Sequence, residues 1–594
     1  MSWFSRSYSS LTESLDHRFG WDKMPKPIAM LTLIGIRNRL RAENLYDSGR
    51  GPDDKPPTGF DDDRHLTART LDGTLNDLKQ PLMGSLGSRF GRNVPLTKAY
   101  PDPPDKLLEP NPRTVSLELL TRKEFIPATT LNLLAGAWIQ FEVHDWFSHG
   151  KNEAENPWVI PVADDDPWPT HPMEIQRTRK DPSSDPNGPP TFVTADTHWW
   201  DGSQIYGSDP AFAQAIRSGE NGKLKIDANG LIPQEVEAHV DLTGVAGNFW
   251  VGLAILHALF MLEHNAICDH LHTKYPQLTD QDLYDKARLV NAALMAKIHT
   301  VDWTPAIIAH PTTVTGMRAN WYGLLGERFD KRFGRQTRNE LFHGIPGSPK
   351  ELFGVPYSLT EEFVAVYRMH PLLPDDFVFR ALGDDHVIQE RTFAEIGVLH
   401  VREVFEQVPL ADLLYSFGIA HPGAIALHNY PRFLQKLDRA DGEILDLAAV
   451  DIVRTRERGV PRYNEFRRLF HLEPVKTFQE LTGGDTELAQ EISRVYGGDI
   501  ERVDLTIGLY AEPKPKGFGF ADTTFRVFVL MASRRLEADR FFTDDYRPEV
   551  YTQAGYDWVE SNTMRSVLLR HFPSLAPTLA GVANPFAPWK TTGS

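Results

Sequence analysis

The most apolar stretch of the chain runs over residues 131–147, where hydrophobic side chains occupy nearly every position. A helix that is apolar all around is buried on every side, so this pattern predicts a core helix. Strict alternation of apolar and polar residues, which is typical of half-buried strands, is scarce. The chain is therefore predicted to be mainly α. Four further stretches with helical spacing are 249–272, 283–299, 359–369 and 523–542.

Long polar connections separate these helices. Residues from about 50 to 115 are rich in proline, glycine and aspartate, which favours an extended arm. Residues 162–192 contain Asp-Asp-Asp-Pro and Asn-Gly-Pro-Pro and are expected to form a loop. No repeat and no linker stands out. We expect one large helical domain at 116–594, with N-terminal helices and an arm, residues 1–115, packed on it.

Charge and cysteine content narrow the function classes. The 594 residues carry a formal net charge of −17, which disfavours nucleic-acid binding because phosphate neutralisation needs a basic surface. An anionic substrate would need a local cationic pocket. The single cysteine, Cys268, rules out an intramolecular disulfide and a cysteine-rich zinc site, and suits a reducing compartment. We interpret it as a small buried core residue.

The N-terminus bears on location and on membrane contact. It has no basic start followed by an apolar run and a small-residue cleavage site, so we expect no signal peptide and a cytoplasmic protein. No stretch approaches the roughly 20 apolar residues of a membrane span. The apolar segment 28–36 could lie on a membrane surface as an amphipathic helix. The favoured alternative is a helix packed on the core.

Gln140 and His144 are four residues apart, so they share one face of the predicted core helix. A haem that activates peroxide needs an imidazole to move a proton between the peroxide oxygens. A nearby amide can orient that imidazole or a water molecule. The alternative for His144 is a core histidine that is hydrogen-bonded to a neighbour.

Tyr367 and His370 are three residues apart and are also expected on one helical face. Haem iron takes a proximal histidine, and a tyrosine one turn away would lie near the porphyrin edge. Core packing is the alternative for this pair.

A run of alternating polar residues indicates a cation site. Calcium takes six to eight oxygen ligands from carboxylates, hydroxyls and carbonyls. Asp145, directly after His144, could complete such a shell, and the alternative is an ordinary polar turn. The candidate ligands on the run are the side chains of Thr197, Asp201 and Ser203 and the backbone carbonyl of Trp199.

These motifs together resemble the animal-type haem peroxidase superfamily, which includes peroxidases, cyclooxygenases and fatty-acid dioxygenases. Over nearly the whole chain the sequence most resembles the fatty-acid alpha-dioxygenases known from plants. Two long strings carry this resemblance, at residues 317–326 and 534–542. It implies haem b as the cofactor and a bound calcium ion, with His144 as the distal histidine, His370 as the iron ligand and Tyr367 as the radical-bearing residue.

The resemblance also assigns two sets of binding residues. Arg454 and Arg458 match haem-contacting arginines, and a guanidinium fork suits a propionate. A solvated charged face remains the alternative for Arg456. The residues that match the family's grip on the fatty-acid carboxylate are His299, Thr304 and Arg535, with Arg534 as second choice to Arg535.

A buried carboxylate must be charge-paired and hydrogen-bonded, which these three side chains can provide. One departure from the plant pattern is Pro305, because proline disfavours helical geometry at the residue before it, here Thr304.

The implied activity is removal of hydrogen from C2 of a fatty acid by a tyrosyl radical, followed by insertion of O2 to give a 2-hydroperoxy acid. Fatty acid, O2 and an activating peroxide are the expected partners, and a monomer is expected. A general haem peroxidase and a mid-chain fatty-acid dioxygenase are the enzymatic alternatives. A helical scaffold that keeps haem or calcium structurally is the non-enzymatic one.

Overall fold

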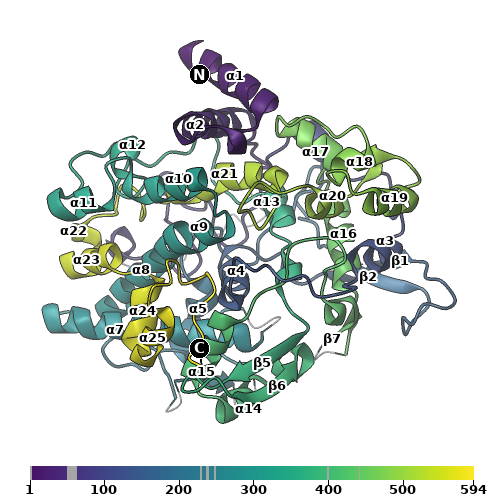
Figure 1. The fold of residues 1–594 in the computed structure, drawn as a ribbon. Helices are drawn as coiled ribbons and strands as arrows, with labels where there is room; N and C mark the ends of the chain where they lie inside the picture. The colour runs from purple at the N-terminus through teal and green to yellow at the C-terminus, as the bar shows by residue number, and fades with distance from the viewer. Residues whose placement is uncertain are drawn as a thin grey trace.

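Helices are the dominant regular structure of the chain, as Figure 1 shows. The computed structural model describes residues 3–49, 63–227, 230–235, 240–245, 249–397, 400–439 and 442–593. Residues 50–62 of the expected arm lie outside the described residues. The longer helices are α1 (Trp3–Phe19), α2 (Lys26–Glu43), α4 (Leu133–Trp146), α7 (Val251–Lys274), α8 (Asp280–Ile298), α10 (Pro311–Tyr322), α15 (Leu410–Ile419), α16 (Leu447–Glu457), α19 (Thr486–Val495), α21 (Asp522–Glu537), α23 (Gln553–Ser561) and α24 (Met564–His571).

The core is built around α4, α7 and α8, which confirms the three longest predicted helices of the first half of the chain. Helix α7 packs against α4, α8, α23 and α24. By length and composition, α7 could cross a membrane. The expectation that no stretch of the chain is long and apolar enough for a membrane span is therefore wrong. Of the most apolar 18 residues of α7, 83% are buried inside the protein. This burial is typical of a core helix that is surrounded by other helices. Cys268 lies on α7 and is fully buried, as expected.

Strands are few and short in the described part of the chain. They form two-stranded antiparallel sheets: β1 (Glu153–Ile160) with β2 (Met173–Arg177), β3 (Gln234–Glu235) with β4 (Val240–Asp241), β5 (Asp376–Arg380) with β6 (Val387–Thr392), and β7 (Leu437–Asp438) with β8 (Ile444–Leu445). Strand β2 corrects the loop expected at 162–192. In β2 only Met173 and Ile175 are buried, so the alternation of buried and exposed positions covers just three residues. A pattern this short does not indicate a strand when polar turns lie on both sides of it.

The helix expected at 359–369 is shorter than the spacing suggested. Helix α13 spans Glu361–Val366, Tyr367 caps its C-terminus, and a 3-10 turn begins at His370. Pro371 explains the early end, because its ring would clash with the carbonyl of Tyr367 in a continued α-helix. Tyr367 and His370 therefore do not share an α-helical face.

At one side of the molecule, helix α2 packs on α10 and α21, and α1 packs on α2 (Figure 1). Arg41 of α2 forms a buried ion pair with Glu537 of α21, and Trp21 Nε1 donates to Asp522 Oδ1 at 2.8 Å. The segment 28–36 thus packs on the core by one face, yet Ile28 and Leu31 remain 45% and 55% exposed.

Candidate functional site

Four residues predicted from different parts of the sequence line one small pocket: His299, Thr304, Tyr367 and Arg535. Each is buried, with at most 7% of its surface exposed. Among the described residues, Thr304 Oγ1 and the Nε and Nη2 atoms of Arg535 have no hydrogen-bond partner. Buried polar atoms are nearly always paired, so unpaired donors turned into one cavity indicate a polar ligand. The remaining lining residues are Trp200, Thr300, Met317, Asn320, Ala532 and Leu536.

A π-helical turn brings His299 and Thr304 to the same side. Helix α8 widens into a π-turn at His299–Trp303, and α9 (Thr304–Ile307) follows. The Thr304 N–H donates to the His299 carbonyl five residues earlier, which is the hydrogen bond of a π-helix. In a regular α-helix, residues five apart point about 140° away from each other. The turn therefore aligns these two side chains.

Pro305 does not displace Thr304 from helical geometry, so the expected disturbance there is wrong. Thr304 has φ −61° and ψ −45°. In an α-helix the Pro305 ring would clash with the carbonyl of Val301, and Val301 lies inside the π-turn, where the backbone departs from α geometry. The proline is thus compatible with the turn that forms the site.

Arg535 carries the positive charge of the pocket. Its guanidinium carbon lies 3.7 Å from the centre of the Trp146 ring and 4.2 Å from that of Trp200. Burial lowers the pKa of Arg535, which remains a cation. Tyr367 packs against Trp146 and Phe363, at 5.6 and 4.3 Å between ring centres, and burial raises the pKa of its hydroxyl. The tyrosine is therefore protonated beside a buried cation.

The hydrogen bonds of His299 fix which nitrogen can act on a ligand. Trp138 Nε1 donates to His299 Nδ1 at 3.2 Å, so Nδ1 is the acceptor and Nε2 carries the proton. Burial, reinforced by Arg535, lowers the pKa of His299 well below its usual value. The neutral ring can donate one hydrogen bond from Nε2 to a carboxylate.

Arg534 faces elsewhere, which agrees with its second rank in the sequence. Its Nη2 donates to the carbonyls of Val355 and Pro356 at 2.8 and 2.9 Å, and it does not line the pocket.

A second, apolar pocket continues the first one toward the surface. The two pockets share Met317, Asn320 and Ala532. Most of the second lining is aliphatic or aromatic and comes from α2, α10 and α21, and two of its members, Leu324 and Leu341, are 58% and 51% exposed. The pair forms an apolar passage that ends at buried polar donors, a shape that suits an acyl chain with a carboxylate at its inner end.

The predicted distal residues lie one turn apart on α4. Burial lowers the pKa of His144 to about 4, and its Nδ1 has no hydrogen-bond partner in the described part of the chain. A neutral imidazole with a free nitrogen can accept a proton from a peroxide. Gln140 Oε1 accepts a hydrogen bond from Trp250 Nε1 at 2.8 Å, which fixes its amide.

The predicted proximal histidine is held by a carboxylate that the sequence did not reveal. His370 Nδ1 lies 2.8 Å from Asp451 Oδ2, and Arg368 Nη1 lies 2.9 Å from Asp451 Oδ1. Burial alone would raise the pKa of Asp451, but Arg368 and His370 hold it below its usual value. With Nδ1 oriented by a carboxylate, Nε2 is the nitrogen that could bind a metal. Asp451 lies on α16, 81 residues later, so no local spacing signalled it.

The two arginines predicted to contact haem, at the end of α16, lie in buried positions that suit a propionate. Arg454 pairs with Glu457 at 2.5 Å, and Arg458 Nε donates to Thr178 Oγ1 at 3.2 Å. Burial and the neighbouring Arg368 and Arg454 lower the pKa of Arg458 to about 10. The lowered pKa means that neighbouring groups do not fully offset the charge of this buried cation, so a further anion would be stabilised there.

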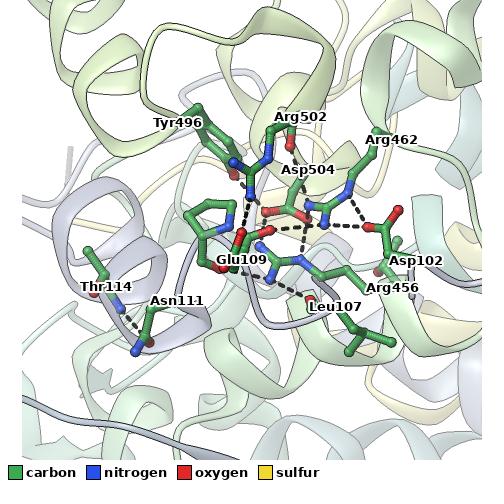
Figure 2. Close-up of polar contacts among 12 residues, drawn as sticks. Asp102, Leu107, Glu109, Asn111, Thr114, Arg456, Arg462, Tyr496, Arg502 and Asp504 are labelled. Atoms are coloured by element: carbon green, nitrogen blue, oxygen red, sulfur yellow. Dashed lines mark hydrogen bonds and ion pairs between the residues drawn. The ribbon is translucent and has the colours of Figure 1, made fainter. Parts of the chain in front are cut away.

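Arg456 is not on a solvated face, which corrects that alternative. It is 3% exposed, and its Nε and Nη2 bind the two oxygens of Asp504 at 2.8 and 2.6 Å (Figure 2). Tyr496 and Arg462 bind the same carboxylate. Arg456 is therefore part of a buried structural network.

The predicted calcium ligands come together in the fold. Ser203 Oγ lies 3.1 Å from Asp145 Oδ1, and Thr197 Oγ1 donates to Asp201 Oδ2 at 3.1 Å. Asp145 Oδ2 is buried without a hydrogen-bond partner. Burial and Asp201 raise the pKa of Asp145 well above its usual value, as expected for crowded carboxylates. Arg288 Nη2, 3.4 Å from Asp201, offsets part of this charge.

No three histidine, cysteine or acidic side chains of the described residues gather as a metal site. A cation here would rely on two carboxylates with hydroxyl and backbone oxygens, which calcium accepts. The side chain of Trp199 makes a separate contact, in which its Nε1 donates a hydrogen bond to the carbonyl of Gly73 at 3.0 Å.

Comparison with known proteins gives one consistent family. Residues 68–580 match the model of the animal haem peroxidase family. The chain is 37% identical to rice alpha-dioxygenase PIOX, over 99% of this chain and 96% of the relative, and 38% identical to Arabidopsis alpha-dioxygenase 2, over 99% and 94%.

Solved structures agree. The crystal structure of rice fatty acid alpha-dioxygenase covers all of this chain and 98% of its own, with a TM-score of 0.91 and 36% identity. A further rice structure is of a Tyr-to-Phe variant with palmitic acid, with the same TM-score, identity and coverage of both chains.

Proposed function

The chain belongs to the animal haem peroxidase family and, within it, to the alpha-dioxygenases, and from this premise we propose that it oxygenates fatty acids at C2. The phenoxyl radical of Tyr367 takes a hydrogen atom from C2 and becomes a tyrosine again. Dioxygen adds to the carbon radical, and the resulting peroxyl group takes a hydrogen atom to give a 2-hydroperoxy acid. Return of that hydrogen from Tyr367 would restore the phenoxyl radical.

The observation that carries this proposal is the meeting of Arg535, His299 and Thr304 at the inner end of an apolar passage, beside Tyr367. A fatty-acid carboxylate held by these donors would keep the adjacent carbon, C2, near the tyrosine. Fixing a reacting carbon in this way raises the rate through proximity. A general peroxidase would need no such clamp, and a mid-chain dioxygenase would need its tyrosine farther from the carboxylate.

The residues present fit a haem b. His370, oriented by Asp451, would ligate the iron, Arg454 and Arg458 would face the propionates, and His144 would act on the peroxide. A haem activated by a peroxide supplies a one-electron oxidant. His144, neutral at pH 7 with a free Nδ1, moves the proton of the peroxide, with Gln140 on the same face of α4.

Product analysis tests the function. Purified haem protein is incubated with palmitic acid, O2 and a trace of peroxide, and products are identified by mass spectrometry. We expect 2-hydroperoxypalmitic acid and its one-carbon-shorter aldehyde from the parent, and neither from Tyr367→Phe, which should still bind haem. Mid-chain products, or oxygen uptake by Tyr367→Phe equal to that of the parent, would contradict the proposal.

We also propose one calcium ion, bound by Asp145, Thr197, Asp201, Ser203 and the Trp199 carbonyl. The support is the contacts between the Thr197 and Asp201 side chains and between those of Ser203 and Asp145, together with the unpaired Asp145 Oδ2. The ion would tie α4, which carries His144, to the 197–203 loop.

Metal analysis of the purified enzyme should find about one calcium per chain, and Asp201→Asn should lose it. Asp209→Asn, an exposed helix cap six residues after Ser203, is the control and should keep it. Active enzyme without calcium would refute the site.

Finally, we propose that the mouth of the apolar passage faces a lipid bilayer, from which the fatty acid enters. Leu324 and Leu341 line the passage and are exposed, and Ile28 and Leu31 of α2 are exposed on the helix that forms one of its walls. Arg332 on α11 (Glu327–Phe333), the helix that follows Leu324, suits anionic lipids, while the neighbouring Lys331 pairs with Glu327 at 2.8 Å.

Co-sedimentation with vesicles that contain anionic lipid should therefore recover the parent, and Leu31→Glu with Leu341→Glu should abolish recovery. Val387→Glu on β6, which is also exposed but lies away from the passage, should not. Equal recovery of both variants would refute the surface.

A further inference from the structure

Two tryptophans lie next to the proposed radical tyrosine and are placed to take part in electron transfer. The Trp146 ring is 5.6 Å from that of Tyr367, and the Trp200 ring is 5.5 Å from that of Trp146, both edge to face. Both indoles are almost fully buried, at 0% and 2% exposure. Contacts this short allow an electron to pass from Trp146 to an oxidised Tyr367, and from Trp200 to Trp146.

Such a transfer would end catalysis. The Tyr367 radical would gain one electron from Trp146 and one proton, giving tyrosine, while Trp146 would become an indole radical cation. A radical on an indole cannot reach C2 of a fatty acid held beside Tyr367. It would instead be trapped by O2 or peroxide as an oxidised tryptophan.

Arg535 lies against both rings, with its guanidinium carbon 3.7 Å from one ring centre and 4.2 Å from the other. A cation is attracted to the electron-rich face of a neutral indole. It repels the same ring once an electron has been removed, and in a buried site this repulsion is only weakly screened. Among the described residues, Nε and Nη2 of Arg535 have no hydrogen-bond partner that would draw the charge away.

We propose that Arg535 has a second role: while its clamp is empty, its stacked charge keeps the oxidising equivalent on Tyr367 by opposing oxidation of Trp146 and Trp200. The inference rests on the proposed radical at Tyr367. It also gives a reason for the direct contact of a carboxylate-binding guanidinium with two indole rings. When a fatty acid binds, its carboxylate offsets the charge, but then C2 is present to consume the radical.

The test uses haem-loaded enzyme without fatty acid, treated with one equivalent of peroxide and frozen within milliseconds. Electron paramagnetic resonance should show a tyrosyl signal for the parent and an added tryptophanyl signal for Arg535→Gln. Peptide mass spectrometry should show at least about tenfold more oxidation of Trp146 and Trp200 in the variant, since even moderate charge repulsion exceeds a tenfold effect. Arg535→Lys, which keeps the cation, should resemble the parent.

Arg534→Gln is the matched control. It removes an equally buried guanidinium from the next position, which binds the Val355 and Pro356 carbonyls and touches neither indole. Its radical signal and tryptophan oxidation should equal those of the parent. Adding Trp146→Phe to Arg535→Gln should remove the tryptophanyl signal.

If Arg535→Gln does not fold or bind haem, the parent with a 2,2-dimethyl fatty acid decides the question. This acid offsets the Arg535 charge but has no hydrogen at C2, so tryptophan oxidation should rise. A tyrosyl signal in the parent, with tryptophan oxidation unchanged by Arg535→Gln or by this acid, overturns the inference and leaves the proposed function intact. A parent that forms no tyrosyl radical overturns both.

Discussion

His144 and His370 are both half-buried imidazoles, and their neighbours give them different chemistry. Asp451 lies 2.8 Å from His370 Nδ1 and fixes which nitrogen of that ring is available. Among the described residues no such carboxylate pairs with His144 Nδ1, and burial lowers the pKa of His144 to about 4, so it stays neutral. The first arrangement suits a metal ligand, and the second suits a group that receives and returns a proton.

Asp451→Asn should therefore weaken haem binding. The amide keeps the size of the side chain but loses the charge that orients His370 and pairs with Arg368. Replacement of a carboxylate behind a metal-bound histidine typically costs about 10–100-fold in affinity. Haem titration followed at the Soret band measures this. A haem affinity equal to that of the parent would mean that Asp451 pairs with Arg368 but does not orient His370 for haem binding.

Arg535→Ala should weaken binding of palmitic acid by at least about tenfold, because a charge-assisted hydrogen bond is lost and the carboxylate is left poorly paired. The methyl ester should be a poor substrate for the parent and should be affected much less by the mutation. Competition and product assays with acid and ester, in the parent, Arg535→Ala and Arg534→Ala, make the comparison. If the parent accepts acid and ester equally, the carboxylate clamp does not exist.

At the scale of elements, the site depends on helices that end or change form at particular residues. Helix α13 stops at Val366, so Tyr367 faces the clamp while His370 faces Asp451. Helix α8 turns π-helical after Ile298, so His299 and Thr304 reach one pocket. A regular continuation of either helix would separate residues that must act together.

Asn132 holds the start of α4, the helix that carries His144. Its Oδ1 accepts from Ala135 N, and its Nδ2 donates to the carbonyls of Pro585 and Ala587 at 2.8 and 3.0 Å. Asn132→Ala removes a helix cap and leaves two carbonyls unpaired, and should lower the free energy of unfolding by roughly 2–4 kcal/mol.

Chemical denaturation measures the loss. Asp485→Ala removes an exposed cap of α19, which accepts from Leu488 N, and should cost only about 1 kcal/mol. The prediction fails if the two variants lose the same stability.

At the scale of the whole molecule, buried ion pairs join the N-terminal part to the catalytic helices. Figure 2 shows Asp504 bound by Arg456 and Arg462, and Arg462 bound in turn to Asp102. Arg456 also donates to the carbonyls of Leu107 and Pro110. The polar arm around residues 102–110 is thus held by Arg456 and Arg462, which share the buried carboxylate of Asp504. The division of the chain at residue 115 stays a prediction.

Asp504→Asn should destabilise the protein by about 3–5 kcal/mol, because it leaves two buried guanidinium groups without their shared carboxylate. Burial alone would raise the pKa of Asp504, but Arg456 and Arg462 hold it below the usual value. Its contribution is therefore complete above about pH 4 and is lost as the pH falls through the lowered pKa.

Urea unfolding at pH 7 and below pH 4 tests both statements, since Asp504→Asn should lose less stability on acidification than the parent. Arg494→Ala, which breaks the exposed pair with Glu118, is the control and should change stability by less than about 1 kcal/mol. Equal effects of the two mutations would contradict the structural role of the network.

Much of the site followed from the sequence because spacing and the family resemblance pointed to its residues. They indicated His144, Tyr367 and His370, the resemblance assigned His299, Thr304 and Arg535, and the structure brings the last three together with Tyr367. Asp451, Trp146 and Trp200 were not assigned these roles, because their contacts join α4, α16 and the 197–203 loop across long sequence separations. Spacing reports only neighbours along one helix.

The sequence by itself determined the mainly α class, the core helices and the family, because apolar periodicity and long motifs are local properties of the chain. Tertiary structure alone decided where helices stop, that Arg456 is buried, and that Arg535 lies against two indoles. The physical reason is that burial and charge pairing depend on which distant segments meet, and a solvated arginine and a buried one have the same letter in the sequence.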